Sequence, residues 1–244
     1  MKILETKHLI KSFGGVHAVD RLSFSIEQGT VTSIIGPNGS GKSTLVHLLT
    51  GMIPSDAGEI VVAGSLHFSR LKSHEVHEYG ITRTFQDVRL FEQMSVLDNV
   101  LVVLTDRTVF GSLFEKHGLY HVKKAEEVLK RVGLWEKYKA LAGGLSYGQR
   151  KLLEIARVLA TNAEIILLDE PFAGLFPEML KVVVSVIKEL RSEGKTILLI
   201  EHNMDLIREL SDHLVVMDAG KLLAEGKPAE VLSKKEVIEA YLGE

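Results

Sequence analysis

The stretch Gly36–Thr44, GPNGSGKST, constrains the fold of this chain more than any other part. It follows a short β-branched run, residues 30–35, and leads into an apolar segment with helical spacing, residues 42–51. Gly, Lys and Ser in this pattern between a strand and a helix are typical of a phosphate-binding loop. The glycines let successive backbone N–H groups turn inward around an anion, and the following helix directs its positive end toward the same point. The stretch therefore predicts a central strand, an anion site and a covering helix.

We expect this loop to hold the phosphates of ATP. Lys42 would neutralise the β- and γ-phosphates, and the Ser43 hydroxyl would be a ligand of Mg²⁺. Thr44 and the backbone amides would hold the α- and β-phosphate oxygens. The predicted nucleotide-binding residues of the loop are Gly36, Pro37, Asn38, Gly39, Ser40, Gly41, Lys42, Ser43 and Thr44.

Adenine is favoured over guanine as the base. The chain has no N-K-x-D sequence of the kind that recognises guanine. Phe13, near the end of the predicted first strand, is the candidate for stacking on the adenine ring, because an aromatic face accepts a base without reading it closely.

A second segment, residues 165–171 (IILLDEP), ends in two acidic residues and would complete a nucleotide site. Four apolar residues predict a buried strand, and Asp169 and Glu170 stand at its carboxyl end, where α/β proteins place their ligands. Asp169 is predicted to hold Mg²⁺ through its water shell. Glu170 is predicted to polarise the water that attacks the γ-phosphate. An acidic pair alone is often a polar strand exit, so the assignment depends on the phosphate-binding loop upstream.

The rest of the chain alternates between strand and helix patterns. A parallel sheet covered on both faces follows from that alternation. Strands are expected at residues 3–13, 18–29, 30–35, 58–64, 163–170, 195–202, 213–220 and 221–226, with the last two as a hairpin. Helices are expected at residues 42–51, 71–80, 95–105, 121–134, 147–160, 177–194, 203–212 and 228–244.

The sequence pattern changes between about residues 87 and 161, where apolar residues recur with helical periodicity. Ser95 and Asp98 stand in the spacing of a helix-capping pair. We predict a single α/β domain, residues 1–244, with a core formed by residues 1–86 and 162–244 and a helical insertion at about 87–161. The fold class is a P-loop NTPase core with a mostly parallel sheet, N-terminal antiparallel strands and an inserted α-helical subdomain.

Composition narrows the range of partners. The formal net charge is -3 and basic residues are spread along the chain, so binding to nucleic acid is not expected. The chain has no cysteine, which excludes disulfides and thiol catalysis. Its apolar stretches are far shorter than the ~20 residues that cross a bilayer. If the protein serves a membrane, another chain must do the crossing.

A second Gly-containing turn, residues 145–149 (LSYGQ), opens directly into another helical segment. It resembles the L-S-G-G-Q signature of ATP-binding cassette (ABC) proteins. Gln86 follows the strand-like TRTFQ, His202 follows TILLIE, and residues 173–177 (AGLFP) follow Glu170, all in the order typical of that family. The resemblance covers essentially the whole chain.

The resemblance implies that two such ATPase subunits, as a homodimer or with a paralogue, pack head to tail. Each ATP then lies between the phosphate-binding loop of one subunit and the signature of the other. Gln86 would touch Mg²⁺ or the attacking water and report to a membrane permease, and His202 would bridge the γ-phosphate and the partner's residues 173–176. The signature residues implied to contact the partner's nucleotide are Ser146, Gly148 and Gln149.

Two positions depart from the family pattern. Tyr147 replaces the usual first Gly of the signature, so its side chain must point away from the phosphate. Phe176 stands where the family often has Asp or Asn.

Residues 80–100 and the ending VIEAYLGE look like those of ATPase subunits from branched-chain amino acid importers. An apolar stretch, Phe85–Val103, is predicted to form a groove for a helix of the permease. Its apolar residues are Val88, Leu90, Phe91, Met94, Val96 and Leu97. The alternative is ordinary packing of these residues inside the helical insertion.

The resulting prediction is an ATP-hydrolysing subunit of an ABC transporter, peripheral to the cytoplasmic face of the cell membrane and importing branched-chain or other amino acids. Two alternatives stay open: the ATPase of a lipid-linked ABC exporter, and an ABC switch protein without a transport role.

Overall fold

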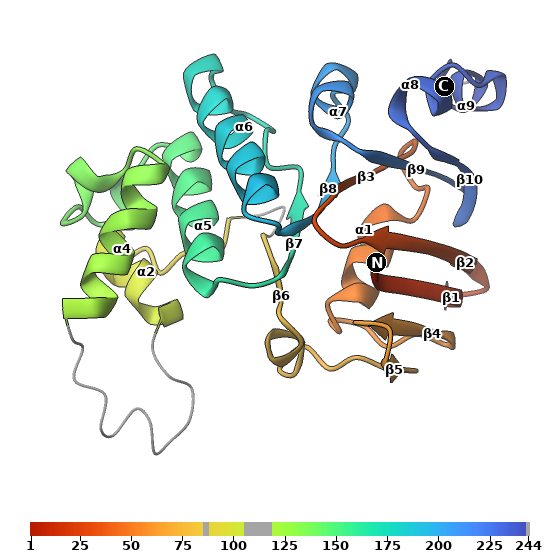
Figure 1. Ribbon diagram of the computed structural model, residues 1–244, viewed down its shortest axis with the longest axis horizontal. Coiled ribbons are helices and arrows are strands. Elements are labelled where there is room, and N and C mark those ends of the chain that lie inside the picture. Colours follow the sequence, from red (N-terminus) through yellow and green to blue (C-terminus); the bar gives the residue numbers. More distant parts are fainter. Residues whose placement is uncertain (85–87, 105–118, 243–244) are drawn as a thin grey trace. The chain divides into compact units, whose positions relative to one another are not determined.

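The computed structural model describes residues 1–84, 88–104 and 119–242, and they form two compact units. The α/β unit contains residues 1–83, 164–170 and 188–244. The helical unit contains residues 84–163 and 171–187. Figure 1 shows the elements of both units.

The α/β unit is built on a six-stranded sheet with the order β10-β9-β3-β8-β7-β6. Every residue of β3, β7 and β8 is buried, as expected for strands covered on both faces. All neighbouring strands are parallel except β9 and β10, which form the predicted hairpin. The strands are β3 (Val31–Ile35), β6 (Ile81–Arg83), β7 (Ile165–Asp169), β8 (Thr196–Ile200), β9 (His213–Asp218) and β10 (Lys221–Gly226).

A second, antiparallel sheet has the order β2-β1-β4-β5. It confirms the predicted N-terminal antiparallel strands. β5 was not expected from the sequence, because it has only three residues and two of them are exposed. The strands are β1 (Lys2–Phe13), β2 (Val16–Glu27), β4 (Ala57–Val62) and β5 (Leu66–Phe68).

Alternate residues of the parallel sheet enter two different cores. Ile34 packs with helix α1 (Lys42–Leu49) and with residues of the antiparallel sheet. Ile35 packs in a second core with residues of α7 (Met204–Leu210), α8 (Pro228–Val231) and α9 (Lys235–Leu242). Helices α1 and α7 accordingly lie on opposite sides of the sheet (Figure 1). The predicted α/β class, with a mostly parallel sheet covered on both faces, is confirmed.

Two expected helices differ in detail. The helix predicted at residues 71–80 is a single 3-10 turn, Val76–Tyr79, which ends at Gly80 with a φ of 69°. The helix predicted at residues 228–244 is divided into α8, which begins at Pro228 and has four residues, and α9, and its last two residues, 243 and 244, lie outside the described residues.

The helical unit packs α2 (Val96–Leu104), α4 (Leu119–Arg131) and α5 (Tyr147–Thr161) against one another. It also contains the first part of α6 (Pro177–Ser192). Ser95 begins α2 as predicted: its Oγ accepts from the backbone N of Asp98 at 3.0 Å and contacts Asp98 Oδ2 at 2.6 Å. The sequence-based boundaries of the insertion, about residues 87–161, remain a prediction.

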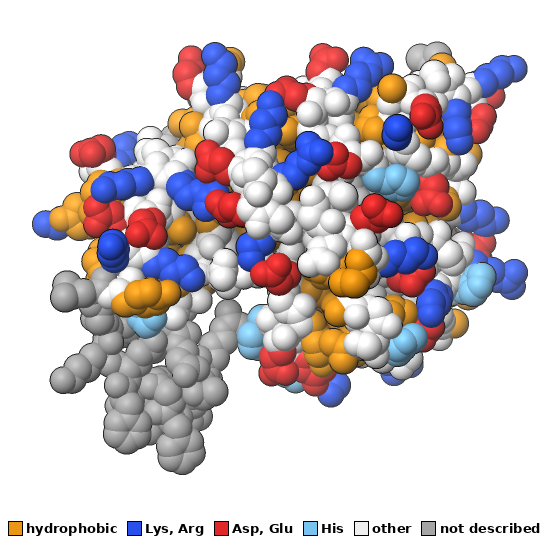
Figure 2. All heavy atoms as spheres, viewed as in Figure 1, with side chains coloured by type: hydrophobic (Ala, Val, Ile, Leu, Met, Phe, Trp, Pro, Cys, Tyr) orange, Lys and Arg blue, Asp and Glu red, His pale blue; other side chains and the backbone are white. Residues whose placement is uncertain are grey.

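No helix among the described residues is long and apolar enough to cross a bilayer. On the face drawn in Figure 2, acidic and basic side chains are interspersed, in keeping with the small net charge of -3.

Candidate functional site

The loop between β3 and α1 depends on glycine where the backbone is crowded. Gly41 is the N-cap of α1 with a φ of 99°, a left-handed conformation that favours glycine. A Cβ on Gly41 would lie 2.1 Å from the carbonyl oxygen of Ala18. A Cβ on Gly36 would lie 2.1 Å from the carbonyl oxygen of Met217. The loop can therefore follow this path against β2 and β9 only with glycine at both positions.

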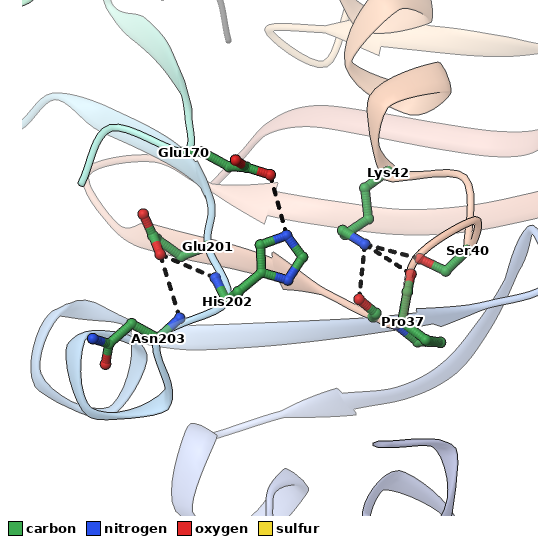
Figure 3. A network of polar contacts seen from close by, with 8 residues as sticks. Pro37, Ser40, Lys42, Glu170, Glu201, His202 and Asn203 are labelled. Carbon is green, nitrogen blue, oxygen red and sulfur yellow. Dashed lines mark hydrogen bonds and ion pairs between the residues drawn. The ribbon is translucent and has the colours of Figure 1, made fainter. Parts of the chain in front are cut away.

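Lys42 closes this loop on itself. Its Nζ donates to the backbone oxygens of Gly36 and Pro37, at 2.7 and 3.0 Å, and to Ser40 Oγ at 3.3 Å (Figure 3). Its side chain is buried, whereas Ser43 is exposed and Thr44 is half-buried at the start of α1. A buried ammonium stabilised by carbonyl oxygens is a preformed site for an anion, because phosphate oxygens are better acceptors for the same donors.

The carboxyl ends of three neighbouring strands meet at the edge that carries this loop. Ile34 pairs with Ile200 across β3 and β8, and Asp169 pairs with Ile200 across β7 and β8. The strands are parallel, so the phosphate-binding loop, Glu170 and His202 all follow strand ends at one edge of the sheet. This is the edge at which open α/β sheets bind ligands.

Glu170 leaves β7 in an unusual conformation. Its φ is 47°, which is uncommon for a residue other than glycine, and its backbone N donates to the Ile200 oxygen at 3.0 Å. Its Oε1 lies 3.2 Å from Nε2 of His202 (Figure 3). Strained backbone of this kind persists where the surroundings hold it, and it clusters at functional sites. The arrangement presents a carboxylate and an imidazole together at the strand edge, a pair that can accept and orient a proton.

Two residues that the sequence did not single out hold His202 in place. Glu201 is buried, and its Oε2 accepts from the backbone N of His202 at 3.0 Å and of Asn203 at 3.3 Å. The Asn203 side chain caps α7 by accepting from the backbone N of Asp205 and Leu206. The signal was present in the sequence, since an acidic residue and an Asn flank His202 between a buried strand and a helix.

Phe13 lies at the end of β1 with about half of its surface exposed. Lys11 Nζ lies 5.4 Å from its ring centroid. Asp56 accepts from Lys11 Nζ at 2.8 Å and from the backbone N of Ser12 at 2.7 Å. The hydrogen bond from Lys11, followed by that from Ser12, lowers the pKa of the Asp56 carboxyl below its ordinary value. The carboxylate therefore anchors the strand end that presents the aromatic ring, a role not expected from the sequence.

The signature turn belongs to the helical unit and begins α5. Ser146 is the N-cap: its Oγ accepts from Gln149 N at 3.4 Å, and Gln149 Oε1 accepts from Ser146 N at 3.1 Å. Ser146 is exposed and Gly148 is buried. While its oxygen accepts, the Ser146 hydroxyl hydrogen is still available for donation, as contact with a phosphate oxygen requires.

Arg150 holds the backbone just before this turn. It donates to the carbonyl oxygens of Leu145 and Gly143 at 3.1 and 2.8 Å, and to Glu92 Oε1 at 3.1 Å. The sequence suggested only a helical position for this residue. Three acceptors on one planar guanidinium make it a structural support of the signature turn.

Gln86 lies outside the described residues, as does Phe85. In the rest of the apolar stretch ending at Val103, Phe91 is about half exposed and Val96 is buried. Val88, Leu90, Met94 and Leu97 are half-buried. The permease groove remains a prediction.

The residues predicted to hold Mg²⁺ are oxygen donors of the kind this ion prefers. Among the described residues, no cluster of three or more His, Cys, Asp or Glu side chains could hold a metal ion. Mg²⁺ bound with a nucleotide typically uses one or two protein ligands together with phosphate oxygens and water. The Ser43 hydroxyl and the buried Asp169 carboxylate meet this requirement.

Comparison with known proteins gives consistent results. Residues 19–173 match the family described as ABC transporter, and residues 221–244 match the branched-chain amino acid ATP-binding cassette transporter family. The chain is 40% identical to the probable branched-chain amino acid transport ATP-binding protein LivG of Methanocaldococcus jannaschii, covering 100% of this chain and 98% of that protein. It is 39% identical to the high-affinity branched-chain amino acid transport ATP-binding protein BraF of Pseudomonas aeruginosa, covering 99% and 98%.

Solved structures agree with the sequence relatives. The ADP conformation of an ATP-binding cassette from an ABC transporter superposes with a TM-score of 0.86 at 39% identity, with 100% of both chains covered. A dimeric cassette in a post-hydrolysis state, bound to ADP and Pi, superposes with a TM-score of 0.81 at 26% identity, with 93% of this chain and 99% of that chain covered. The chain therefore belongs to the ABC transporter family as an ATP-binding ATPase subunit, and it is similar to the ATP-binding proteins of branched-chain amino acid transport.

Proposed function

We propose that this chain binds Mg-ATP between its own phosphate-binding loop and the signature of a second ABC ATPase subunit, hydrolyses it, and so drives a separate membrane permease. The second subunit is another copy of this chain or a paralogue. The observation that carries the proposal is the juxtaposition of Glu170 and His202 at the sheet edge that bears Lys42.

Glu170 acts as the general base in this scheme. Its carboxylate takes a proton from the water that attacks the γ-phosphate, and its left-handed backbone directs it out of the strand toward that water. His202 orients Glu170 through the 3.2 Å contact and reaches the γ-phosphate and the partner's residues 173–176. Lys42 neutralises the charge of the β- and γ-phosphates.

The remaining contacts follow from the chemistry of each side chain. Ser43, Asp169 and Gln86 would hold Mg²⁺, which would offset the negative charge of the phosphates. Phe13 stacks on adenine. Across the interface, Ser146, Gly148 and Gln149 face the partner's γ-phosphate with a hydroxyl, a backbone amide and an amide side chain.

We further propose that the permease imports branched-chain or related amino acids, and that the chain is peripheral to the cytoplasmic face of the membrane. The names of the relatives support the cargo, and the dimeric cassette supports the paired arrangement. We also propose that the chain is one ABC ATPase domain. Its core is formed by residues 1–86 and 162–244, and its helical insertion by about residues 87–161. The apolar stretch Phe85–Val103 is the proposed contact with the permease.

The test is ATP hydrolysis and amino acid uptake by the complete transporter reconstituted in vesicles. Leucine uptake that requires both ATP and Glu170 supports the proposal. ATP hydrolysis by the assembled transporter without amino acid uptake contradicts the proposed cargo, and ATPase activity that persists in Glu170→Gln contradicts the proposed base.

A further inference from the structure

The ring of Tyr147 lies directly against the backbone of Gly174. A Cβ built on Gly174 would lie 2.9 Å from Cε1 and 3.3 Å from Cδ1 of the tyrosine. Gly174 has a φ of 71°, a left-handed conformation that favours glycine. The tyrosine side chain thus occupies the space that any side chain at position 174 would need.

A second contact joins the same two segments. A Cβ on Gly148 would lie 2.4 Å from Sδ of Met179 and 3.4 Å from Cδ2 of Leu175. Two successive residues of the signature turn, Tyr147 and Gly148, therefore pack closely on the segment that begins α6. Both contacts lie within the helical unit.

Tyr147 has a further neighbour on its own helix. Lys151 Nζ lies 5.8 Å from the ring centroid, within the range of a cation–π interaction, and the Lys151 side chain is buried. Yet about half of the Tyr147 surface remains exposed, and 72% of the Phe176 surface is exposed. The ring is held from its own helix and from Gly174 while it still faces outward.

We propose that Tyr147 is a positioning residue that fixes residues 173–176 against the signature turn, so that both segments meet the partner subunit as one preformed surface. The inference rests on the proposed function, in which the turn serves the partner's ATP and residues 173–176 meet the partner's His202. Glycine at 174 is flexible by itself, and the tyrosine ring removes that freedom by occupying the space beside it. Pre-ordering of this kind strengthens association because less freedom is lost on binding.

The experiment is a double-mutant cycle on the full chain in the Glu170→Gln background. The variants are Tyr147→Ala, Gly174→Ala and the double variant, with Tyr147→Phe as the matched control that keeps the ring. Light scattering measures the ATP concentration needed for half-maximal dimerisation, and a fluorescent ATP analogue measures the affinity of the dilute monomer. Thermal unfolding reports whether each variant is folded.

Tyr147→Ala should raise the ATP concentration for half-maximal dimerisation by about threefold or more. A threefold change is near the lower end of the interaction energies measured between residues in contact. Monomer affinity should stay within about twofold, which a general loss of structure would not allow. Gly174→Ala should also weaken dimerisation, by steric conflict with the ring, and the double variant should lose less than the product of the two single losses. Tyr147→Phe keeps the ring and should behave like the parent. If Tyr147→Ala fails to fold, Tyr147→Leu replaces it in the cycle, and Tyr147→Phe remains the control.

Parent-like dimerisation of Tyr147→Ala, or losses that simply multiply in the double variant, would overturn the positioning role and leave the proposed function standing. A Glu170→Gln parent that dimerises with Mg-ATP neither with itself nor with a paralogous subunit would overturn the proposed function, and this inference with it.

Discussion

Nε2 of His202 lies 3.2 Å from Oε1 of Glu170, although 32 residues separate them in the chain. Parallel pairing of β7 with β8 creates this proximity, because Asp169 and Ile200 are partners in the register and the two side chains follow them. The relationship places a carboxylate and an imidazole side by side at one edge of the sheet.

Glu170→Gln should abolish turnover while ATP binding is kept. Gln has the same shape but cannot accept a proton, and loss of one general base costs about 10²–10⁴-fold in kcat. Steady-state hydrolysis and ATP titration check the two parts separately. Near-normal hydrolysis by this variant would remove Glu170 from its role.

Glu201→Ala should lower kcat by about 10- to 100-fold, because the backbone N–H groups of His202 and Asn203 lose their shared acceptor and His202 shifts. The free energy of unfolding should fall by about 1.5–3 kcal/mol, the range for hydrogen bonds to a charged group. Glu201→Gln, which retains an acceptor oxygen, is the matched control and should lose less of both. A Glu201→Ala variant with normal kcat and lowered stability would limit Glu201 to a structural role.

Phe13→Ala should weaken ATP binding by about 1–3 kcal/mol, the range for an aromatic side chain stacked on a base. Phe13→Trp, which retains an aromatic face, should bind ATP as the parent does. Fluorescence titration with ATP and with inorganic triphosphate separates base recognition from phosphate recognition. Equal losses for both ligands would mean that the ring does not contact adenine.

Leu90→Asp or Met94→Asp should uncouple ATP hydrolysis from transport, since both side chains are half-buried in the apolar stretch proposed to meet the permease. Basal ATPase activity of the isolated subunit should persist, whereas permease-dependent uptake in vesicles should fall. Tyr120→Asp, an exposed change on α4 outside that stretch, is a control for added surface charge. Full uptake by both apolar variants would place the permease contact elsewhere.

Much of this site could be predicted from sequence because local patterns carry it. The loop at Gly36–Thr44 needs its glycines for close approach to Ala18 and Met217, and strand ends can be recognised from short apolar runs. Contacts made by tertiary packing could not be predicted in this way. Arg150 reaches Glu92 across 58 residues, and Asp56 reaches Ser12 across 44. Neither pair leaves a periodic signal, because each depends on how distant segments are brought together. The strand β5 was missed because three residues are too few for an alternation.

The direction of the Tyr147 side chain also depends on tertiary packing. The sequence required its side chain to point away from the phosphate, but the direction could not be derived. The structure places the ring on Gly174, a residue whose left-handed φ and missing side chain make room for it.

In the proposed mechanism, Lys42 binds the nucleotide of its own chain and Ser146 binds that of the partner. The most direct measurement is the ATP affinity of dilute monomers by fluorescence titration, for Lys42→Ala and Ser146→Arg, with Ser146→Thr as a control that keeps the helix cap. Lys42→Ala should weaken monomer binding by about 1.5–3 kcal/mol, the range for a hydrogen bond to a charged group. Ser146→Arg should bind ATP as the parent does, yet fail to dimerise in the Glu170→Gln background. If Ser146→Arg weakens monomer binding as severely as Lys42→Ala, the signature acts on the nucleotide of its own chain and does not serve the partner.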